Sequence, residues 1–128
     1  MIEKQAKPFL KWAGGKTQLL TVIGSEFHYK HHDKFVYVEP FVGSGAVLFW
    51  VLSNYPNVEK VIINDINFDL INSYKIIKNN VATLINILEQ WQKEYYAFVE
   101  RQDLKKKYYY AKRELFNKRI FSDIEQAA

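Results

Sequence analysis

The middle of the sequence carries two short apolar runs that are separated by a glycine-containing loop and a helical pattern. The first run, residues 35–38, is aromatic and β-branched, stops at Glu39-Pro40, and therefore predicts a strand. The loop at residues 41–45 precedes a run with the composition of a buried helix, at residues 46–52. A second strand is predicted at residues 61–63, which are apolar on both faces, as in a parallel sheet covered by helices. This order predicts the first half of a doubly wound α/β domain.

Helical patterns account for most of the remaining sequence. Apolar residues recur at helical spacing over residues 19–27, and Asn67 is placed to cap the helix that follows the second strand. The pattern stays helical from residue 81 to about residue 121, with no strand of comparable quality. We therefore expect two parts, an α/β part at residues 1–78 and the start of a helical domain at residues 79–128.

The last residues contain the start of another helix. Ser122 and Glu125 have the spacing of a capping box, in which the serine caps the helix and the glutamate lies three residues on. The sequence ends three residues later, at Ala128. Because a domain rarely ends one turn into a new helix, we expect the chain to be cut within the helical domain.

The composition excludes several classes of protein and site. The chain has 128 residues, 48% of them hydrophobic, and no cysteine, which excludes a Cys-based zinc site and a thiol nucleophile. No apolar run approaches the length of a membrane span, and the first residues lack the layout of a signal peptide. We therefore expect a cytoplasmic protein without a membrane partner. His28, His31 and His32 lie beside lysines in a polar stretch and are expected at the surface, not around a metal ion.

Positive charge is concentrated between residues 101 and 119. This stretch has eight Lys or Arg residues and two acidic residues, in a chain of net charge +4. Cations interleaved with Tyr108, Tyr109 and Tyr110 are typical of a surface that faces phosphates, and a solvated helical face is an equally good interpretation. We expect these tyrosines, and those at 95–96, to pack between helices and not on bases. The candidate nucleic-acid contacts are Lys105, Lys106, Lys107, Lys112 and Arg113.

The loop after the first strand and the acid after the second indicate a ligand. Gly43 and Gly45 let the backbone pass close beneath a bound molecule, although an ordinary turn would also use them. A dinucleotide fingerprint would need a small residue where the sequence has Leu48, so the pyrophosphate-binding pattern is absent. Asp65 ends the second strand, where a carboxylate accepts hydrogen bonds from ribose hydroxyls or else caps a helix. Together they favour an adenosine-bearing ligand without a pyrophosphate, a description that fits S-adenosylmethionine.

A third element is the segment at residues 9–17, FLKWAGGKT. Its last three residues, Gly15-Lys16-Thr17, invite a phosphate-loop interpretation, but that motif needs a glycine at position 10, which is Leu10, and a preceding strand. Trp12 instead offers a planar apolar surface between two lysines. Such a segment suits stacking near a nucleoside and attraction of a carboxylate or phosphate.

In their order and spacing, the motifs Lys-Trp-Ala-Gly-Gly-Lys, Glu-Pro-Phe-Val-Gly-Ser-Gly-Ala and Asn-Asp-Ile-Asn resemble those of the Dam-type DNA adenine-N6 methyltransferases (D12 class, alpha group). The resemblance covers residues 7–78 and, more weakly, the helical stretch, which takes the place of the family's target-recognition domain. It implies a Rossmann-like methyltransferase sheet in a bacterial or phage-encoded protein. It also implies methyl transfer from S-adenosylmethionine to N6 of an adenine flipped out of double-stranded DNA. The implied cofactor-site residues are Trp12, Lys16, Glu39, Pro40, Phe41, Gly43, Gly45 and Asp65, with Lys11 nearer the DNA.

The sequence departs from this family in one respect. The family's catalytic motif is Asp-Pro-Pro-Tyr, and the three prolines here, Pro8, Pro40 and Pro56, form no pair. In the family that motif follows the recognition domain. We therefore expect no catalytic residue in this chain and no activity of the chain alone. We also expect marginal stability and self-association through sheet edges that later strands would otherwise cover.

Three other functions fit parts of the sequence. A cytosine-C5 methyltransferase also uses Phe-x-Gly-x-Gly, but its cysteine nucleophile is absent here. A non-catalytic nucleic-acid-binding module would use the basic stretch at residues 101–119, with the α/β part as a scaffold. An ATP-binding protein would use Gly15-Lys16-Thr17.

Overall fold

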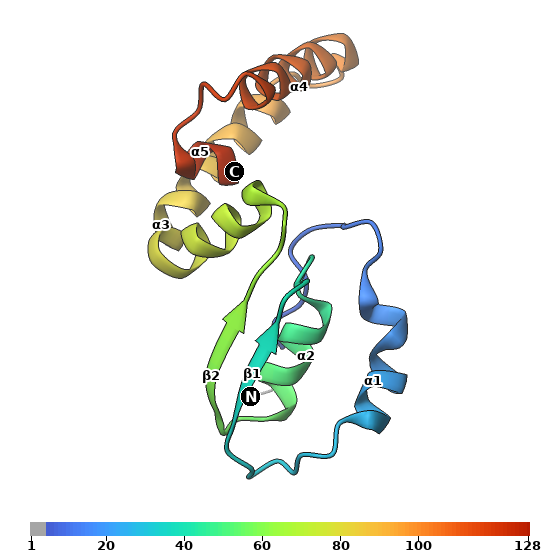
Figure 1. Ribbon diagram of the computed structural model, residues 1–128. Helices are drawn as coiled ribbons and strands as arrows, with labels where there is room; N and C mark the ends of the chain where they lie inside the picture. Colours follow the sequence, from blue (N-terminus) through green and yellow to red (C-terminus); the bar gives the residue numbers. More distant parts are fainter. Residues whose placement is uncertain (1–4) are drawn as a thin grey trace. The chain divides into compact units, whose positions relative to one another are not determined.

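The computed structural model describes residues 5–128, which form a mixed α/β structure of two compact units (Figure 1). The first unit is Met1–Ile66 and the second is Asn67–Ala128. In chain order the first unit contains η1 (Lys16–Leu19, a 3₁₀ turn), α1 (Leu20–Glu26), β1 (Phe35–Glu39), α2 (Ala46–Asn54) and β2 (Val58–Ile63). The predicted order of helix, strand, glycine loop, helix and strand is confirmed.

The two strands pair in parallel, with Tyr37 opposite Val61 and Val38 opposite Ile62. Parallel neighbours need a crossover connection, and α2 supplies it between the end of β1 and the start of β2. Because the strands run in the same direction, their carboxyl ends meet at one edge of the sheet. The loops that follow both strands therefore lie together at this edge.

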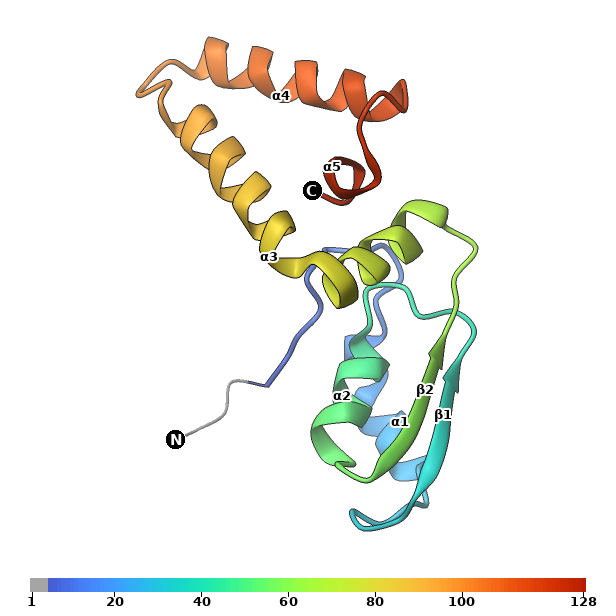
Figure 2. The same cartoon turned by 90° about the vertical axis from the view of Figure 1, so that its left-hand side faces the viewer.

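One face of the sheet forms the core of the first unit. Phe35 of β1 and Val47 and Val51 of α2 are buried, and Val51 has no exposed surface. Residues of α1 pack on the same cluster, and Figure 2 shows α1 and α2 on the same side of the strands. Phe27 and Tyr55 add aromatic contacts, with ring centroids 4.9 Å apart. Burial of these apolar and aromatic surfaces is the main stabilising term for this unit.

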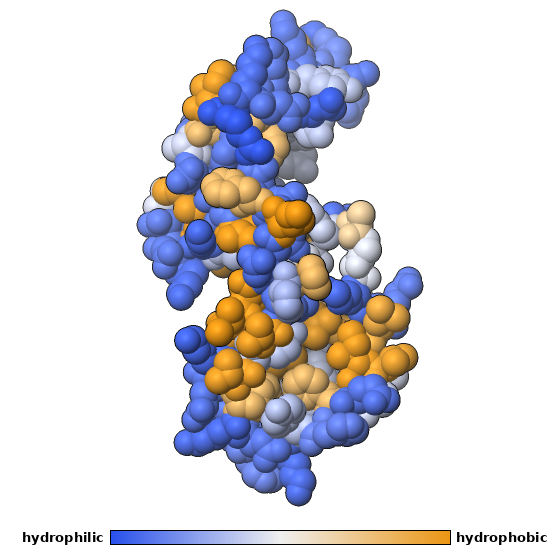
Figure 3. Space-filling model, in the orientation of Figure 1, coloured by the Kyte–Doolittle hydropathy of each residue, from blue (hydrophilic) through white to orange (hydrophobic). Residues whose placement is uncertain are grey.

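The other face of the sheet is open in the part of the chain that the structure describes. Val36, Val38 and Ile62 are 51%, 55% and 43% exposed, and alternation along the strands places all three on this face. Figure 3 shows hydrophobic side chains at the surface where these strands lie. Among residues 5–128, helices cover one face of the sheet only, and helices on both faces, as in a doubly wound sheet, stay a prediction. Apolar side chains on both faces follow from the sequence, but what covers each face depends on distant segments.

The second unit is helical, as the periodicity predicted. It consists of α3 (Phe68–Tyr96), α4 (Gln102–Asn117) and α5 (Asp123–Ala127). Asn67 caps α3 by accepting a hydrogen bond from the backbone N–H of Leu70 at 3.0 Å, which confirms the predicted cap. The long helix is interrupted at Asn80, whose φ of −142° is not helical. Asn80 therefore divides α3 into two helical segments with different directions.

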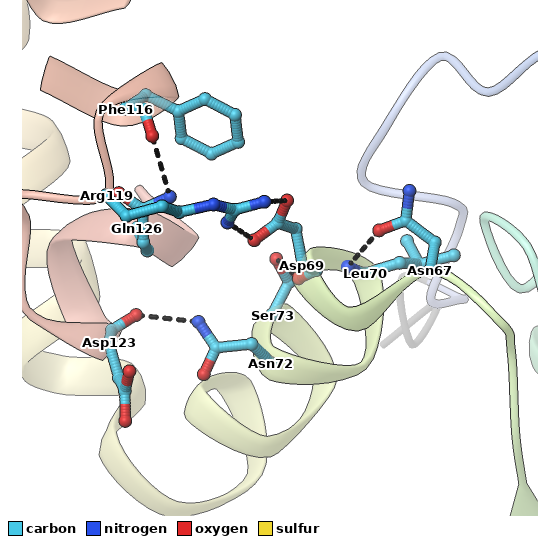
Figure 4. A network of polar contacts seen from close by, with 9 residues as sticks. All are labelled: Asn67, Asp69, Leu70, Asn72, Ser73, Phe116, Arg119, Asp123 and Gln126. Atoms are coloured by element: carbon cyan, nitrogen blue, oxygen red, sulfur yellow. Dashed lines mark hydrogen bonds and ion pairs between the residues drawn. The ribbon is translucent and has the colours of Figure 1, made fainter.

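A network of polar contacts joins the first turns of α3 to the end of the chain (Figure 4). Arg119 donates two hydrogen bonds to the carboxylate of Asp69, one of them at 2.9 Å. The amide of Asn72 donates to the backbone carbonyl of Asp123 at 2.7 Å. The predicted capping box is present at the start of α5, where the hydroxyl of Ser122 accepts from the backbone N–H of Glu125. These contacts hold α5 against α3.

Along the chain, the boundary between the two units falls between Ile66 and Asn67. It lies twelve residues before the domain boundary expected from the sequence, at 78/79. The expected boundary coincides instead with the interruption of α3 at Asn80. The division into a cofactor-binding part, residues 1–78, and a DNA-recognition part, residues 79–128, stays a prediction.

Candidate functional site

The candidate site lies in the first unit, where the loops after β1 and β2 meet. Backbone hydrogen bonds hold the two loops together. The N–H of Asn64 donates to the carbonyl of Glu39, and the N–H of Val42 donates to the carbonyl of Asn64, both at 2.9 Å. The glycine loop and the acid that follows β2 are therefore parts of one small structure, as the sequence suggested.

The glycine loop has a backbone that only glycine adopts without strain. Gly43 has a φ of +52° and Gly45, which precedes the first residue of α2, has a φ of +86°. The backbone N–H of Gly43 donates to Oδ2 of Asp65 at 3.0 Å. Asp65 is half-buried, and this bond orients its carboxylate across the loop. The pairing of loop and acid inferred from their spacing is thus a direct contact.

Trp12 approaches the same loop from the start of the chain. A Cβ atom added to Gly43 would lie 3.5 Å from Cδ1 of Trp12, so the indole edge faces the backbone of Gly43. The indole is 38% exposed, and Gly14 beside it has a φ of +73° that turns the chain. The structure therefore brings together Trp12, Gly43 and Asp65, which lie far apart in the sequence.

A second cluster lies beside this loop and is centred on Glu39. Its side chain is buried, with 7% of its surface exposed, although it carries an ionisable carboxyl group. Lys16 lies 3.5 Å from Oε1 of Glu39 and donates to the carbonyl of Phe41 at 2.5 Å. Tyr37 donates its hydroxyl hydrogen to Oε2 of Glu39 at 2.7 Å. The predicted residues Lys16 and Glu39 are therefore in contact.

Tyr37 was missed by the sequence analysis. Residues two apart on a strand point to the same face, so the spacing of Tyr37 and Glu39 was a usable signal. Burial of the phenol and its hydrogen bond to Glu39 raise the pKa of Tyr37 well above its usual value. The hydroxyl therefore stays protonated and remains a donor over the whole physiological pH range.

The remaining predicted residues of this site lie at its open side. Phe41 is 75% exposed and Pro40 is exposed, whereas Gly45 is buried at the start of α2. Lys11 is exposed next to Trp12. The cavity between the Trp12 segment and the glycine loop measures about 10 Å³, which is room for about one water molecule.

Apart from Lys11, the predicted nucleic-acid contacts lie on α4, and they differ in environment. Lys106, Lys107 and Arg113 are exposed. Lys112 turns towards α3, where its ammonium group lies 4.3 Å from the ring centre of Trp91 and 3.9 Å from the carboxylate of Glu94. Lys105 is half-buried and lies over the rings at 95–96. The exposed cations are therefore better placed than Lys112 to meet a phosphate.

The tyrosines at residues 95–96 and 108–110 also differ in environment, since some pack between helices and others are exposed. Tyr108 packs near Tyr95, with ring centroids 6.3 Å apart, and donates a hydrogen bond to Glu94 at 2.5 Å. Burial and this bond raise the pKa of Tyr108. Tyr96, Tyr109 and Tyr110 are 48–60% exposed, so the expectation that the whole set packs between helices is wrong for these three.

Among residues 5–128 there is neither a cluster of metal-ligating side chains nor a membrane-spanning helix. His28, His31 and His32 are exposed, and no three His, Cys, Asp or Glu side chains in this range gather closely enough to hold a metal ion. No helix of the described chain combines the length and apolar character needed to cross a membrane.

Comparison with known proteins matches residues 12–128 to the family of D12 class N6 adenine-specific DNA methyltransferases. A type II methyltransferase of Methanocaldococcus jannaschii, M.MjaIII, is 47% identical over 116 residues, covering 89% of this chain and 39% of the relative. The DNA adenine methylase of Haemophilus influenzae is 43% identical, over 87% of this chain and 34% of its own length. That of Escherichia coli K12 is 35% identical, over 90% of this chain and 36% of its own. The chain thus spans between a third and two fifths of the length of these relatives.

Proposed function

This chain belongs to the family of D12 class N6 adenine-specific DNA methyltransferases, and from that premise we propose that its first unit binds S-adenosylmethionine at the carboxyl ends of β1 and β2. The family uses S-adenosylmethionine as its methyl donor. The observation that carries the proposal is the hydrogen bond from Gly43 to Asp65, with the indole edge of Trp12 facing the same glycine. A positive-φ glycine, a carboxylate and an indole at the end of a parallel sheet suit an adenosine-bearing ligand.

The chemistry of the side chains fits each part of this donor. The carboxylate of Asp65 is placed to accept hydrogen bonds from the two ribose hydroxyls, because Oδ2 is already oriented by the N–H of Gly43. The indole of Trp12 and the exposed ring of Phe41 offer apolar surfaces for the adenine and the thioether region. Glu39 and Lys16 provide one negative and one positive group for the zwitterionic amino-acid end.

For the whole protein we propose transfer of a methyl group to N6 of an adenine that has been extruded from duplex DNA. Bound S-adenosylmethionine supplies an electrophilic methyl group. The first unit orients this donor, and the exposed cations of α4 contribute contacts to DNA phosphates. The sheet would then be the first part of a Rossmann-like methyltransferase sheet, with the second unit at the start of the target-recognition domain.

We propose that the 128-residue chain does not methylate DNA by itself. The family's Asp-Pro-Pro-Tyr motif binds the amine of the target adenine, and the three prolines of this sequence form no such pair. Incubation of the purified chain with adenine-containing duplex DNA and labelled donor is expected to transfer no methyl group. Transfer above the background without protein would refute this.

Binding of the donor can be tested by titrating the chain with S-adenosylmethionine in a calorimeter. Asp65→Asn removes the negative charge while keeping the size of the side chain. We expect it to weaken binding at least about tenfold, the range of a hydrogen bond to a charged group. Asp33→Asn is the matched control, because Asp33 also accepts a backbone N–H, from Lys30 at 2.7 Å, but lies outside the site. Equal affinities of Asp65→Asn and Asp33→Asn would contradict the proposal.

A non-catalytic nucleic-acid-binding module is the second candidate, because the exposed cations of α4 do not depend on a cofactor. Anisotropy of labelled duplex DNA tests it. The double variant Lys106→Gln, Lys107→Gln is expected to weaken binding and to lower the salt dependence by about one per lost contact. Lys112→Gln is the control, because its ammonium group is engaged by Trp91 and Glu94. DNA binding in a chain that ignores S-adenosylmethionine would favour this second function.

A further inference from the structure

The buried carboxylate of Glu39 is held from two sides, by Tyr37 and by Lys16. Tyr37 lies on the same face of β1 and donates to Oε2 at 2.7 Å. Lys16 approaches Oε1 at 3.5 Å, a long contact, and directs its shorter bond of 2.5 Å to the carbonyl of Phe41. One carboxylate oxygen is thus tightly fixed, whereas the other has only a weak partner.

This arrangement needs a reason, because burying a carboxylate is costly unless it is hydrogen-bonded. A residue required only for packing at this position could be apolar, as its strand neighbours are. The phenol of Tyr37 reaches Oε2 while its ring packs against the core of the first unit. It therefore fixes the side-chain conformation of Glu39 and leaves Oε1 facing the ammonium group of Lys16.

We propose that Tyr37 is a positioning residue, which holds Glu39 so that Oε1 receives the α-ammonium group of the donor's amino-acid end. Lys16, next to Glu39, is then placed for the α-carboxylate of the same zwitterion. The inference rests on the proposed binding of S-adenosylmethionine. It adds a residue to that site and assigns the polarity of the amino-acid end within it.

Two ligands separate this role from a purely structural one. S-adenosylmethionine carries the amino-acid end, whereas methylthioadenosine has the same nucleoside and a thioether but no amino-acid end. Calorimetric titration of the full chain with each ligand measures both affinities. Tyr37→Phe keeps the ring and removes the hydroxyl, and we expect it to weaken S-adenosylmethionine roughly three- to tenfold, as for one net hydrogen bond. The affinity for methylthioadenosine is expected to stay the same.

Tyr29→Phe is the matched control. Its ring also packs against Phe35, with centroids 4.4 Å apart, but Tyr29 is 50% exposed and away from Glu39. It should change neither affinity. Glu39→Gln should reproduce the selective loss and keeps the proposal testable if Tyr37→Phe fails to fold. In the Glu39→Gln background, Tyr37→Phe should add less than about a twofold effect, because the two changes remove one shared interaction.

The outcomes are distinct. If the unaltered chain binds neither ligand, the proposed function fails, and this inference fails with it. If it binds both but Tyr37→Phe weakens them equally, or changes neither, Tyr37 has no positioning role and only the inference is overturned. A Glu39→Gln variant that binds S-adenosylmethionine normally would also overturn it.

Discussion

Gly43→Ala tests the geometry of the glycine loop most directly, because its effects on folding and on binding have different origins. With φ at +52°, an alanine at this position is strained. The left-handed conformation costs about 1–2 kcal/mol for a residue with a Cβ atom. The lower entropy of the unfolded alanine chain offsets roughly 0.4–1 kcal/mol of this. The middle of these two ranges leaves a net loss of about 0.8 kcal/mol in the free energy of unfolding.

The effect on donor binding should be larger than this loss of stability. In the free protein the added methyl group meets only the indole of Trp12, at 3.5 Å from Cδ1 and 3.9 Å from Nε1, which are ordinary contacts. A bound donor that passes over Gly43 would collide with the same methyl group. Overpacking of a close contact costs typically about 1–3 kcal/mol, which corresponds to at least about a fivefold loss of affinity.

Gly14→Ala is the control for strain alone. Gly14 also has a positive φ, +73°, but an added Cβ would have no atom within 4 Å. Thermal unfolding followed by circular dichroism should show melting temperatures lowered by a few degrees in both variants, about 4–8 °C per kcal/mol for a unit of this size. Titration with S-adenosylmethionine should separate them, with the larger loss in Gly43→Ala. Binding by Gly43→Ala equal to that of the unaltered chain would refute the proposed passage of the donor over this loop.

Three other changes test the fold. Leu70→Ala should destabilise the second unit by about 2–5 kcal/mol, because Leu70 is 1% exposed. Ile85→Ala, at a 48% exposed position, should lower the free energy of unfolding only slightly. Denaturant unfolding measures both changes. The hydrogen bonds from Ser122 lower the pKa of Glu125, so their stabilisation is present above the ordinary glutamate value of 4.5 and is lost as the pH falls through the lower folded value. The difference in melting temperature between Ser122→Ala and the unaltered chain should therefore shrink in acid to the part contributed by the bond from the backbone N–H of Glu125 to the hydroxyl of Ser122, and a difference that does not change with pH would contradict this assignment. Val38→Lys on the open sheet face should reduce self-association in sedimentation experiments, because it replaces an exposed apolar side chain with a charge, and unchanged association would contradict this.

Much of the local structure was predictable, because its causes are local. The strand at Phe35, the turn at Gly43 and the cap at Asn67 each depend on the conformational preferences of a few adjacent residues. Asp65 was also correctly paired with the glycine loop, since parallel strands place their carboxyl ends together. The motifs around these residues were sufficient to identify the family, which the match over residues 12–128 confirms.

The sequence by itself therefore determined the order of elements, the glycine loop after the first strand and the family. Only the tertiary structure decided which charged groups meet, since hydrogen bonds such as those of Glu39 with Lys16 and Tyr37 depend on side-chain conformation. It also decided that Lys112 turns towards Trp91 and that Val38 remains exposed. The physical reason is that a residue's own preferences act over one or two turns of chain. Burial and charge pairing depend instead on atoms that are distant in sequence and are brought close only by packing.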